Sequence, residues 1–212
     1  MLVRVSSTPQ NRQGTATRAL LVETAERLFA EQGVDAVSVR AVNAAAGVGA
    51  ASVHYHFGAK DELLRAVVMD LGGVLAAATR VNVDALAAAP EPPTPEAVVR
   101  AVTGPYLELL HQHRIRGMRW IKIVAQTALI GPADDIIDPL ELDLLAQVRR
   151  AFPDADPDRL QRRWAMVVLA FAEGLSRADE WGEPGLSIEA LDAFYEDLVA
   201  FMIGGAERML NS

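Results

Sequence analysis

Apolar residues recur at helical spacing along almost the whole chain, and this periodicity limits the fold more than any other feature of the sequence. Leu21, Ala25 and Leu28 are a clear example, because residues three and four apart share one face of an α-helix. The alternating pattern of a β-strand is nearly absent, and glycine and proline interrupt the helical pattern at short intervals. The sequence therefore predicts an all-α fold of nine helices, at residues 15–33, 38–46, 50–57, 60–89, 94–113, 115–130, 139–152, 157–181 and 187–210.

Composition narrows the class of protein. The 212 residues are 51% hydrophobic, which is enough for one large core or for a small domain joined to a larger one. There is no cysteine, so disulfides and thiolate metal sites are excluded. The first residues lack the apolar region of a signal peptide, and no uninterrupted apolar run approaches the roughly 20 residues that a membrane crossing needs. We therefore expect a cytoplasmic protein that does not enter a membrane.

Charge is distributed unevenly along the chain. The net charge is −8, but residues 1–66 carry seven Lys/Arg against six Asp/Glu, whereas residues 67–212 carry thirteen against twenty-two. Only the N-terminal part can approach a phosphate backbone without strong repulsion. An excess of one positive charge is small, so any argument for DNA binding has to rest on the local pattern of residues.

Residues 15–65 are the segment most informative about function, and they follow a flexible arm expected at residues 1–14. Ser38 is a good N-cap for a short helix, Gly47 interrupts the pattern, and a second short helix ends at Gly58. Two short helices joined by a tight turn and braced by a helix on each side form a helix-turn-helix, which places its second helix in the major groove of DNA. We expect residues 15–65 to be this DNA-binding domain and residues 66–212 to be a second domain.

The same segment resembles the TetR family of regulators. The family pattern is an apolar helix ending A-x-x-L-F-x-x-x-G, followed by T-x-x-x-I-A-x-x-A-G-V-S-x-G-x-L-Y-x-H-F-x-S-K-x-x-L. The chain carries AERLFAEQG at residues 25–33 and SVRAVNAAAGVGAASVHYHFGAKDEL at residues 38–63, so many positions agree in order and spacing without a gap. The resemblance implies a homodimeric repressor with a three-helix reading head and a C-terminal helical bundle, released from its operator by a small apolar or amphipathic ligand.

Candidate DNA contacts lie on the two short helices and at the start of the next. The side chains of Ser52, Tyr55 and their histidine neighbours offer hydrogen-bond donors to phosphates or base edges. Lys60 begins a helix, where its ammonium and the free N–H groups both attract phosphate. The resemblance implies backbone contacts for several of them. The full set expected at the DNA interface is Ser38, Arg40, Gly49, Ala50, Ala51, Ser52, His54, Tyr55, His56 and Lys60.

The chain departs from the family pattern at positions that matter. Gly49 replaces the usual Ser or Thr cap of the recognition helix, and the alanines at 50–51 leave its front without a long polar side chain. His54 stands where Tyr is usual, and Asn43 where Ala is usual. Base readout is therefore expected to use thymine methyl groups, Tyr55 or the shape of the DNA.

The second domain is expected to bind the effector and to dimerise. The resemblance implies that the effector lies among helices near residues 106–127, where a plain core role for each residue is the competing interpretation. The pocket residues expected, with Trp120 the strongest single candidate, are Tyr106, Met118, Trp120, Ile123, Gln126 and Thr127. The resemblance also implies dimerisation through the last two long helices, and the interface residues expected are Met166, Leu169, Ala170, Phe194, Leu198, Phe201 and Met202.

Other functional interpretations are weaker. His54 and His56, two residues apart on a helix, point about 200° apart and cannot share one metal ion. His111 and His113 have the same spacing near an expected helix end where the chain can turn, and with the arginines at 114 and 116 beside them a solvated or anion-facing cluster is expected. The arginine pairs at 149–150 and 162–163 are expected to form surface ion pairs. No catalytic motif is evident, so we expect no cofactor, no metal and no enzymatic activity. The alternative from another class is a helical small-molecule-binding protein or enzyme with a vestigial DNA head.

Overall fold

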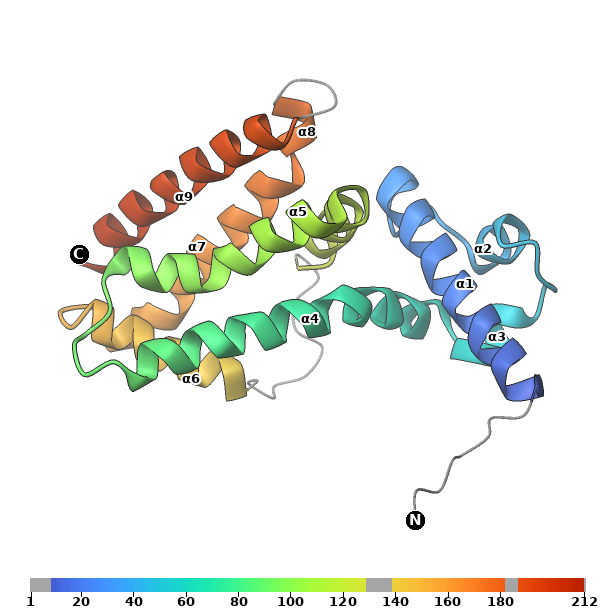
Figure 1. Ribbon diagram of the computed structural model, residues 1–212, viewed down its shortest axis with the longest axis horizontal. Helices are drawn as coiled ribbons and strands as arrows, with labels where there is room; N and C mark the ends of the chain where they lie inside the picture. The colour runs from blue at the N-terminus through green and yellow to red at the C-terminus, as the bar shows by residue number, and fades with distance from the viewer. Residues whose placement is uncertain (1–8, 129–138, 182–186, 212) are drawn as a thin grey trace, which may run out of the picture. The chain divides into compact units, whose positions relative to one another are not determined.

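The computed structural model describes residues 9–128, 139–181 and 187–211 of the chain. This part is all-helical, and the predicted fold class is confirmed. The nine helices found there are α1 (Pro9–Gln32), α2 (Val39–Ala45), α3 (Ser52–Phe57), α4 (Lys60–Ala88), α5 (Pro95–Ala128), α6 (Pro139–Ala151), α7 (Pro157–Ser176), α8 (Ala178–Trp181) and α9 (Ile188–Leu210). They belong to two compact units, Met1–Asp70 and Leu71–Ser212, and α4 contributes to both (Figure 1).

The N-terminal unit is built around one face of α1. Leu21, Ala25 and Phe29 on that face are completely buried, as is Val53 of α3. Burying one large apolar side chain contributes about 1.5–3 kcal/mol. The periodic residues that predicted an amphipathic helix are therefore the ones that hold the short helices α2 and α3 in place.

The first helix is longer than its sequence pattern predicts. The start expected at Thr15 is wrong, because α1 begins at Pro9. Proline is well suited to a first helical turn, and the hydroxyl of Thr17 donates to the carbonyl oxygen of Gln13, 3.0 Å away. Gly14, which costs a helix about 1 kcal/mol relative to alanine, does not interrupt it. The first eight residues of the expected arm lie outside the described part of the chain.

The C-terminal unit has its core among α5, α7 and α9, which pack against one another (Figure 1). A chain of aromatic side chains lies inside it: Tyr106 packs on Trp120 and, edge to face, on Phe171, whose ring in turn meets Tyr195. The hydroxyl groups of Thr103 and Tyr195 are hydrogen-bonded at 2.9 Å. Edge-to-face aromatic pairs add about 0.5–1.5 kcal/mol beyond the burial of their area.

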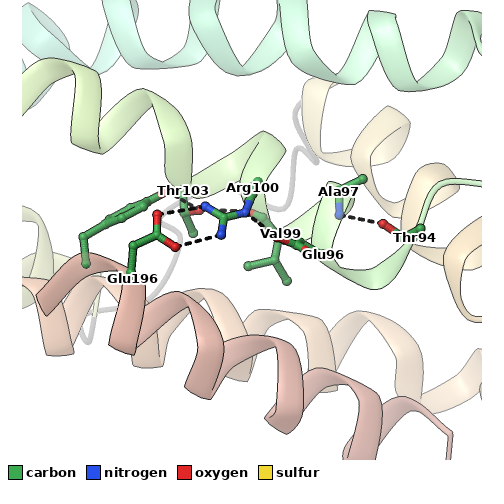
Figure 2. A network of polar contacts seen from close by, with 8 residues as sticks. Thr94, Glu96, Ala97, Val99, Arg100, Thr103 and Glu196 are labelled. Atoms are coloured by element: carbon green, nitrogen blue, oxygen red, sulfur yellow. Dashed lines mark hydrogen bonds and ion pairs between the residues drawn. The ribbon is translucent and has the colours of Figure 1, made fainter. Parts of the chain in front are cut away.

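An arginine joins α5 to α9 beside this core (Figure 2). The guanidinium of Arg100 donates to Glu96 on its own helix at 2.7 Å, and through two nitrogens to the carboxylate of Glu196, at 2.8 and 3.1 Å. These hydrogen bonds from Arg100 hold the pKa of Glu196 below its usual value. The pair therefore stabilises the packing of α9 on α5 when the carboxylate is ionised.

Two predicted helix boundaries in the C-terminal unit have different outcomes. The helix end expected near His113 is confirmed as a kink within α5, where His113 has the non-helical angles φ −140° and ψ 54°. The single helix expected over residues 157–181 is wrong, because α7 ends at Ser176 and α8 starts afresh at Ala178. Arg177 lies between them and pairs with Glu173 and Glu180 on either side of the break.

Two of the arginines expected to form surface ion pairs bind main-chain carbonyl groups: Arg150 of α6, and Arg163 of α7, whose guanidinium donates to the carbonyl oxygen of Met209 on α9. Arg150 of α6 donates to the main-chain oxygens of Leu86, Ala89 and Glu91 at 2.8–2.9 Å, and to the side chain of Gln147. The ion-pair prediction is therefore wrong for Arg150, whose planar fork satisfies carbonyl groups at the carboxyl end of α4.

By length and composition alone, α4 meets the criterion of a membrane-spanning helix. Asp70 and Arg80 interrupt its apolar sequence, and Arg80 pairs with Asp143 of α6. One such helix is weak evidence for a membrane, because helices from protein cores meet the same criterion.

Candidate nucleic-acid interface and ligand cavity

The first short helix of the head starts at a side-chain cap. Ser38 is in the extended conformation, and its hydroxyl oxygen accepts the N–H of Ala41 at 3.2 Å. This arrangement satisfies one of the free N–H groups of the first turn of α2. The predicted N-cap at Ser38 is confirmed, and the side chain is exposed beside the helix start.

A tight turn joins α2 to α3. Gly47 has φ +65°, a left-handed conformation that side chains with a Cβ rarely adopt, and the N–H of Val48 donates back to the carbonyl of Asn43 at 3.1 Å. The side chain of Asn43 reaches across the turn: its Nδ2 donates to the carbonyl of Ala50 at 2.7 Å, and its Oδ1 accepts the N–H of Val53 at 3.1 Å. Asn43 is only 2% exposed. The sequence marked Asn43 as unusual but did not predict these contacts.

The tip of the head is open to solvent. Gly49, Ala50 and Ala51 are exposed, and the ring of Tyr55 on α3 is 84% exposed. The ring meets that of His56 edge to face, with 4.9 Å between centroids, and most of its surface is available to a partner. Arg40 is also exposed, whereas Ser52 and His56 are half-buried.

His54 is exposed, but one of its ring nitrogens is already hydrogen-bonded within the protein. Nδ1 lies 2.7 Å from the carbonyl oxygen of Gly58, so this nitrogen donates and closes the end of α3. Nε2 is the ring nitrogen left for a partner, whereas the hydroxyl of a tyrosine at this position could both donate and accept. Lys60, half-buried at the start of α4, donates to the carbonyl oxygen of Asp35 at 3.4 Å.

Arg18 is a contributor that the sequence analysis did not identify. Its guanidinium lies over the ring of Phe57, 4.9 Å from the centroid, and so braces the end of α3 against α1. No periodicity distinguishes Arg18 from the other exposed polar residues of α1. The contact exists only because the two helices pack together.

The C-terminal unit has a small pocket between α4 and α5, with a volume of about 270 Å³, and its lining residues Glu108, Gln112 and His113 are exposed. Apolar side chains form most of its wall, while Glu108, Gln112 and His113 supply polar groups. Its lining residues are Leu71, Val74, Leu75, Ala78, Pro105, Glu108, Leu109, Gln112 and His113. On each of the two helices the lining residues are three or four positions apart, so they share one face of the helix. This spacing is the signal in the sequence that could have indicated that α4 and α5 each present one face to the cavity.

The role of the residues expected to hold the ligand stays a prediction. Trp120 and Ile123 are 4% and 0% exposed. Burial raises the pKa of the Tyr106 hydroxyl, in keeping with its place in the aromatic chain of the core. Met118 and Thr127 are half-buried, and Gln126 is exposed. None of the six expected residues lines the cavity between α4 and α5.

The expected dimer residues differ in exposure. Met166 and Leu169 of α7 are 55% and 43% exposed, and Phe201 of α9 is 69% exposed. Ala170 is exposed as well, while Phe194 and Leu198 are half-buried. Met202 is 2% exposed and belongs to the core of the protomer, so it presents no surface to a partner.

The histidine pairs each contain a residue with another partner. His111 of α5 lies 2.6 Å from a carboxylate oxygen of Asp192 on α9, so it joins two helices of the C-terminal unit. His54 is bonded to the end of its own helix. Both contacts are consistent with structural roles for these rings.

A helix-turn-helix followed by a larger helical unit is the arrangement of DNA-binding regulators that carry their own sensor domain. Residues 21–67 match the model of the bacterial regulatory proteins of the tetR family, and residues 100–205 match that of the tetracyclin repressor-like C-terminal domain. The chain belongs to the TetR family of transcriptional regulators. The predicted resemblance is confirmed.

Known proteins agree with this assignment. The chain is 29% identical over 186 residues to the HTH-type transcriptional regulator BetI of Rhizobium meliloti (strain 1021), covering 86% of this chain and 87% of that protein. It shares its fold with a TetR-like regulator from Rhodococcus sp. RHA1, with a TM-score of 0.56, 18% identity and coverage of 89% and 96%. NalD, the secondary repressor of the MexAB-OprM multidrug efflux pump in Pseudomonas aeruginosa, also has a TM-score of 0.56, with 19% identity and coverage of 92% and 97%.

Proposed function

We propose that this TetR-family regulator is a cytoplasmic repressor that binds a two-fold operator as a homodimer. The observation that carries the proposal is the head itself, in which a glycine turn joins α2 to α3 and leaves the tip and Tyr55 exposed. Two such heads enter successive major grooves, about 34–36 Å apart. Arg40 and Lys60 contact phosphates, and Tyr55 and the small residues at 49–51 meet the base edges.

The effector in this proposal occupies the cavity between α4 and α5. Its apolar wall fits a small apolar or amphipathic molecule, and Glu108 and Gln112 select a hydrogen-bonding group on that molecule. The wall includes Leu71 and Leu75 of α4, the helix whose first residue, Lys60, belongs to the reading head. A coupling of about 1–3 kcal/mol between the two sites would weaken operator binding about 5–150-fold.

Dimerisation in this proposal uses the exposed apolar residues of α7 and α9. Met166, Leu169 and Phe201 leave large apolar surfaces open to water in the single protomer. Ala170 and the half-buried residues Phe194 and Leu198 complete the surface. A second copy of the same surface would cover it around a two-fold axis.

The experiment that tests the function starts from purified full-length protein and sheared genomic DNA of the source organism. Bound fragments are selected and sequenced, and gel-shift titration measures affinity for the enriched duplex with and without a panel of small amphipathic molecules. Specific binding that one of these molecules weakens is the expected result. Absence of any specific binding, together with turnover of a bound metabolite, would favour the enzyme alternative. DNA binding that no molecule in the panel weakens would contradict the proposal that a small apolar or amphipathic molecule releases the protein from its operator.

A further inference from the structure

The recognition helix α3 starts without a cap of its own. Its N-terminal flanking residue, Ala51, makes no side-chain hydrogen bond to the helix. The two residues before it, Gly49 and Ala50, have no polar side chain either. A helix of six residues has most of its N–H groups unsatisfied by the helix itself, and short helices are marginal without outside support.

Asn43 of α2 supplies the missing acceptor. Its Oδ1 accepts the N–H of Val53, the second residue of α3, at 3.1 Å. An N-cap side chain makes this same bond to the second or third residue of its own helix. Here the acceptor comes instead from ten residues away, across the turn.

The other end of the same amide fixes the turn itself. Nδ2 of Asn43 donates to the carbonyl of Ala50 at 2.7 Å, and the main-chain carbonyl of Asn43 accepts from Val48 at 3.1 Å. Asn43 is 2% exposed, so its side chain does not reach a ligand outside the head. A buried amide is tolerated because both its polar atoms are paired, and either one alone and unpaired would be costly.

We propose that Asn43 is the positioning residue of the recognition helix, a remote cap that supplies the side-chain acceptor missing at Ala51. Asn43 acts through α3, since it fixes where Tyr55 and His54 stand. Its consequence for DNA rests on the proposed function, but the capping itself does not.

The test uses full-length protein carrying Asn43→Ala or Asn43→Asp. The first readout is amide hydrogen exchange in free protein, comparing Val53 with Ala41, whose N–H is capped by Ser38 instead. The second is affinity for the genome-selected duplex.

Asn43→Ala is expected to speed the exchange of Val53 about tenfold and to weaken duplex binding by about the same factor, with Ala41 little changed. Unchanged exchange of Val53 in Asn43→Ala would overturn the proposal. If Asn43→Ala unfolds the head, Asn43→Asp, which keeps the acceptor, is decisive. A folded Asn43→Asp head with a protected Val53 supports the proposal, and an unfolded one overturns it.

Asn43→Asp separates the two bonds of the amide. A carboxylate still accepts from Val53 but cannot donate to Ala50, so Val53 should stay protected while the turn loosens. Rapid exchange of Val53 in this variant would also contradict the remote cap. Exchange is measured without DNA, so a wild-type protein that binds no duplex would refute the proposed function while the exchange rates still decide whether Asn43 caps α3.

Discussion

The head has few positive side chains with which to bind DNA. Between residues 38 and 60 the only lysine or arginine residues are Arg40 and Lys60. Much of the affinity must therefore come from main-chain N–H groups, hydroxyl groups and helix starts, which position a protein on the phosphate backbone without reading sequence. In the proposed function, Arg40 and Lys60 would therefore each carry a large share of the salt dependence of binding.

Lys60→Ala should weaken binding to all duplexes by a similar factor. Removing one phosphate contact should also flatten the plot of log affinity against log salt by about one. Salt titrations of the wild type and the variant measure both effects. Lys122→Ala is the matched control, because Lys122 pairs with Asp179 in the C-terminal unit and its loss removes the same charge. An equal change of slope in the Lys60→Ala and Lys122→Ala variants would show that Lys60 does not contact DNA.

Glu196→Gln tests a single ion pair through its pH dependence. Arg100 lowers the pKa of Glu196, so the pair stabilises the folded protein fully above the ordinary pKa of 4.5, and this stabilisation is lost as pH falls through the lowered value. The pair is largely exposed, so the variant should lose only about 0.5 kcal/mol near pH 7. Urea unfolding at pH 7 and at pH 3.5 measures the difference, which should shrink at the lower pH. If the difference in unfolding free energy between wild type and Glu196→Gln were the same at both pH values, the charge of Glu196 would not contribute to stability.

Among the helices, the breaks that depend on local backbone geometry were predictable from the sequence. Gly33, Gly47 and Gly58 each have a positive φ, at 89°, 65° and 78°, which glycine adopts at little cost. The break at Arg177 has no glycine or proline beside it, and the role of Asn43 depends on partners seven and ten residues away. Contacts made by packing leave no local pattern, so the sequence did not identify them.

Arg150→Lys tests how α6 holds the end of α4. A lysine keeps the charge but cannot donate to Leu86, Ala89 and Glu91 together, so we expect a loss of about 1.5–3 kcal/mol. Thermal unfolding should show a melting temperature lower by roughly 2–4 °C for each kcal/mol. Arg149→Lys, at the exposed neighbouring position, is the control and should melt as the wild type does. Equal melting temperatures of the Arg150→Lys and Arg149→Lys variants would show that the guanidinium of Arg150 does not stabilise the end of α4.

Ala78→Phe tests the pair of helices that line the cavity. A phenyl group at this half-buried lining position fills part of the 270 Å³, so the response to an identified effector should fall at least about tenfold, while effector-free DNA binding persists. Ala76→Phe on the exposed side of α4 is the control. Gel-shift titration with the effector measures both. A normal response in Ala78→Phe would place the effector elsewhere.

For the whole molecule, the sequence predicted the class of protein, while the location of the effector site stays a prediction. The family pattern fixed the head residue by residue, because a short turn and two helices are local. The cavity is formed by Leu71 to Ala78 and by Pro105 to His113, which only tertiary packing brings together. Trp120 was the leading candidate because a large ring suits a pocket, yet the same property suits the core in which it is buried.

Assembly is the remaining property of the whole molecule, and it can be tested at one residue. Phe201→Glu puts a charge on the most exposed large apolar side chain of α9, which is 69% exposed in the protomer and therefore costs the isolated chain little stability. In a two-fold interface each substitution occurs twice around the axis, so two carboxylates would be desolvated near each other. Light scattering should then report the mass of one chain where the wild type gives two. Binding to the selected duplex should fall at least about 100-fold, since a single head reads only one half-site.

Ile115→Glu is the control for Phe201→Glu, because Ile115 is 72% exposed on α5, away from the proposed interface, and the change of polarity is the same. It should leave the protein dimeric and the duplex affinity unchanged. Dimers of Phe201→Glu at micromolar concentration would reject the surface of α7 and α9 as the interface. Monomers that still bind the duplex with wild-type affinity would reject the two-fold reading of the operator, because occupancy of one half-site would then suffice.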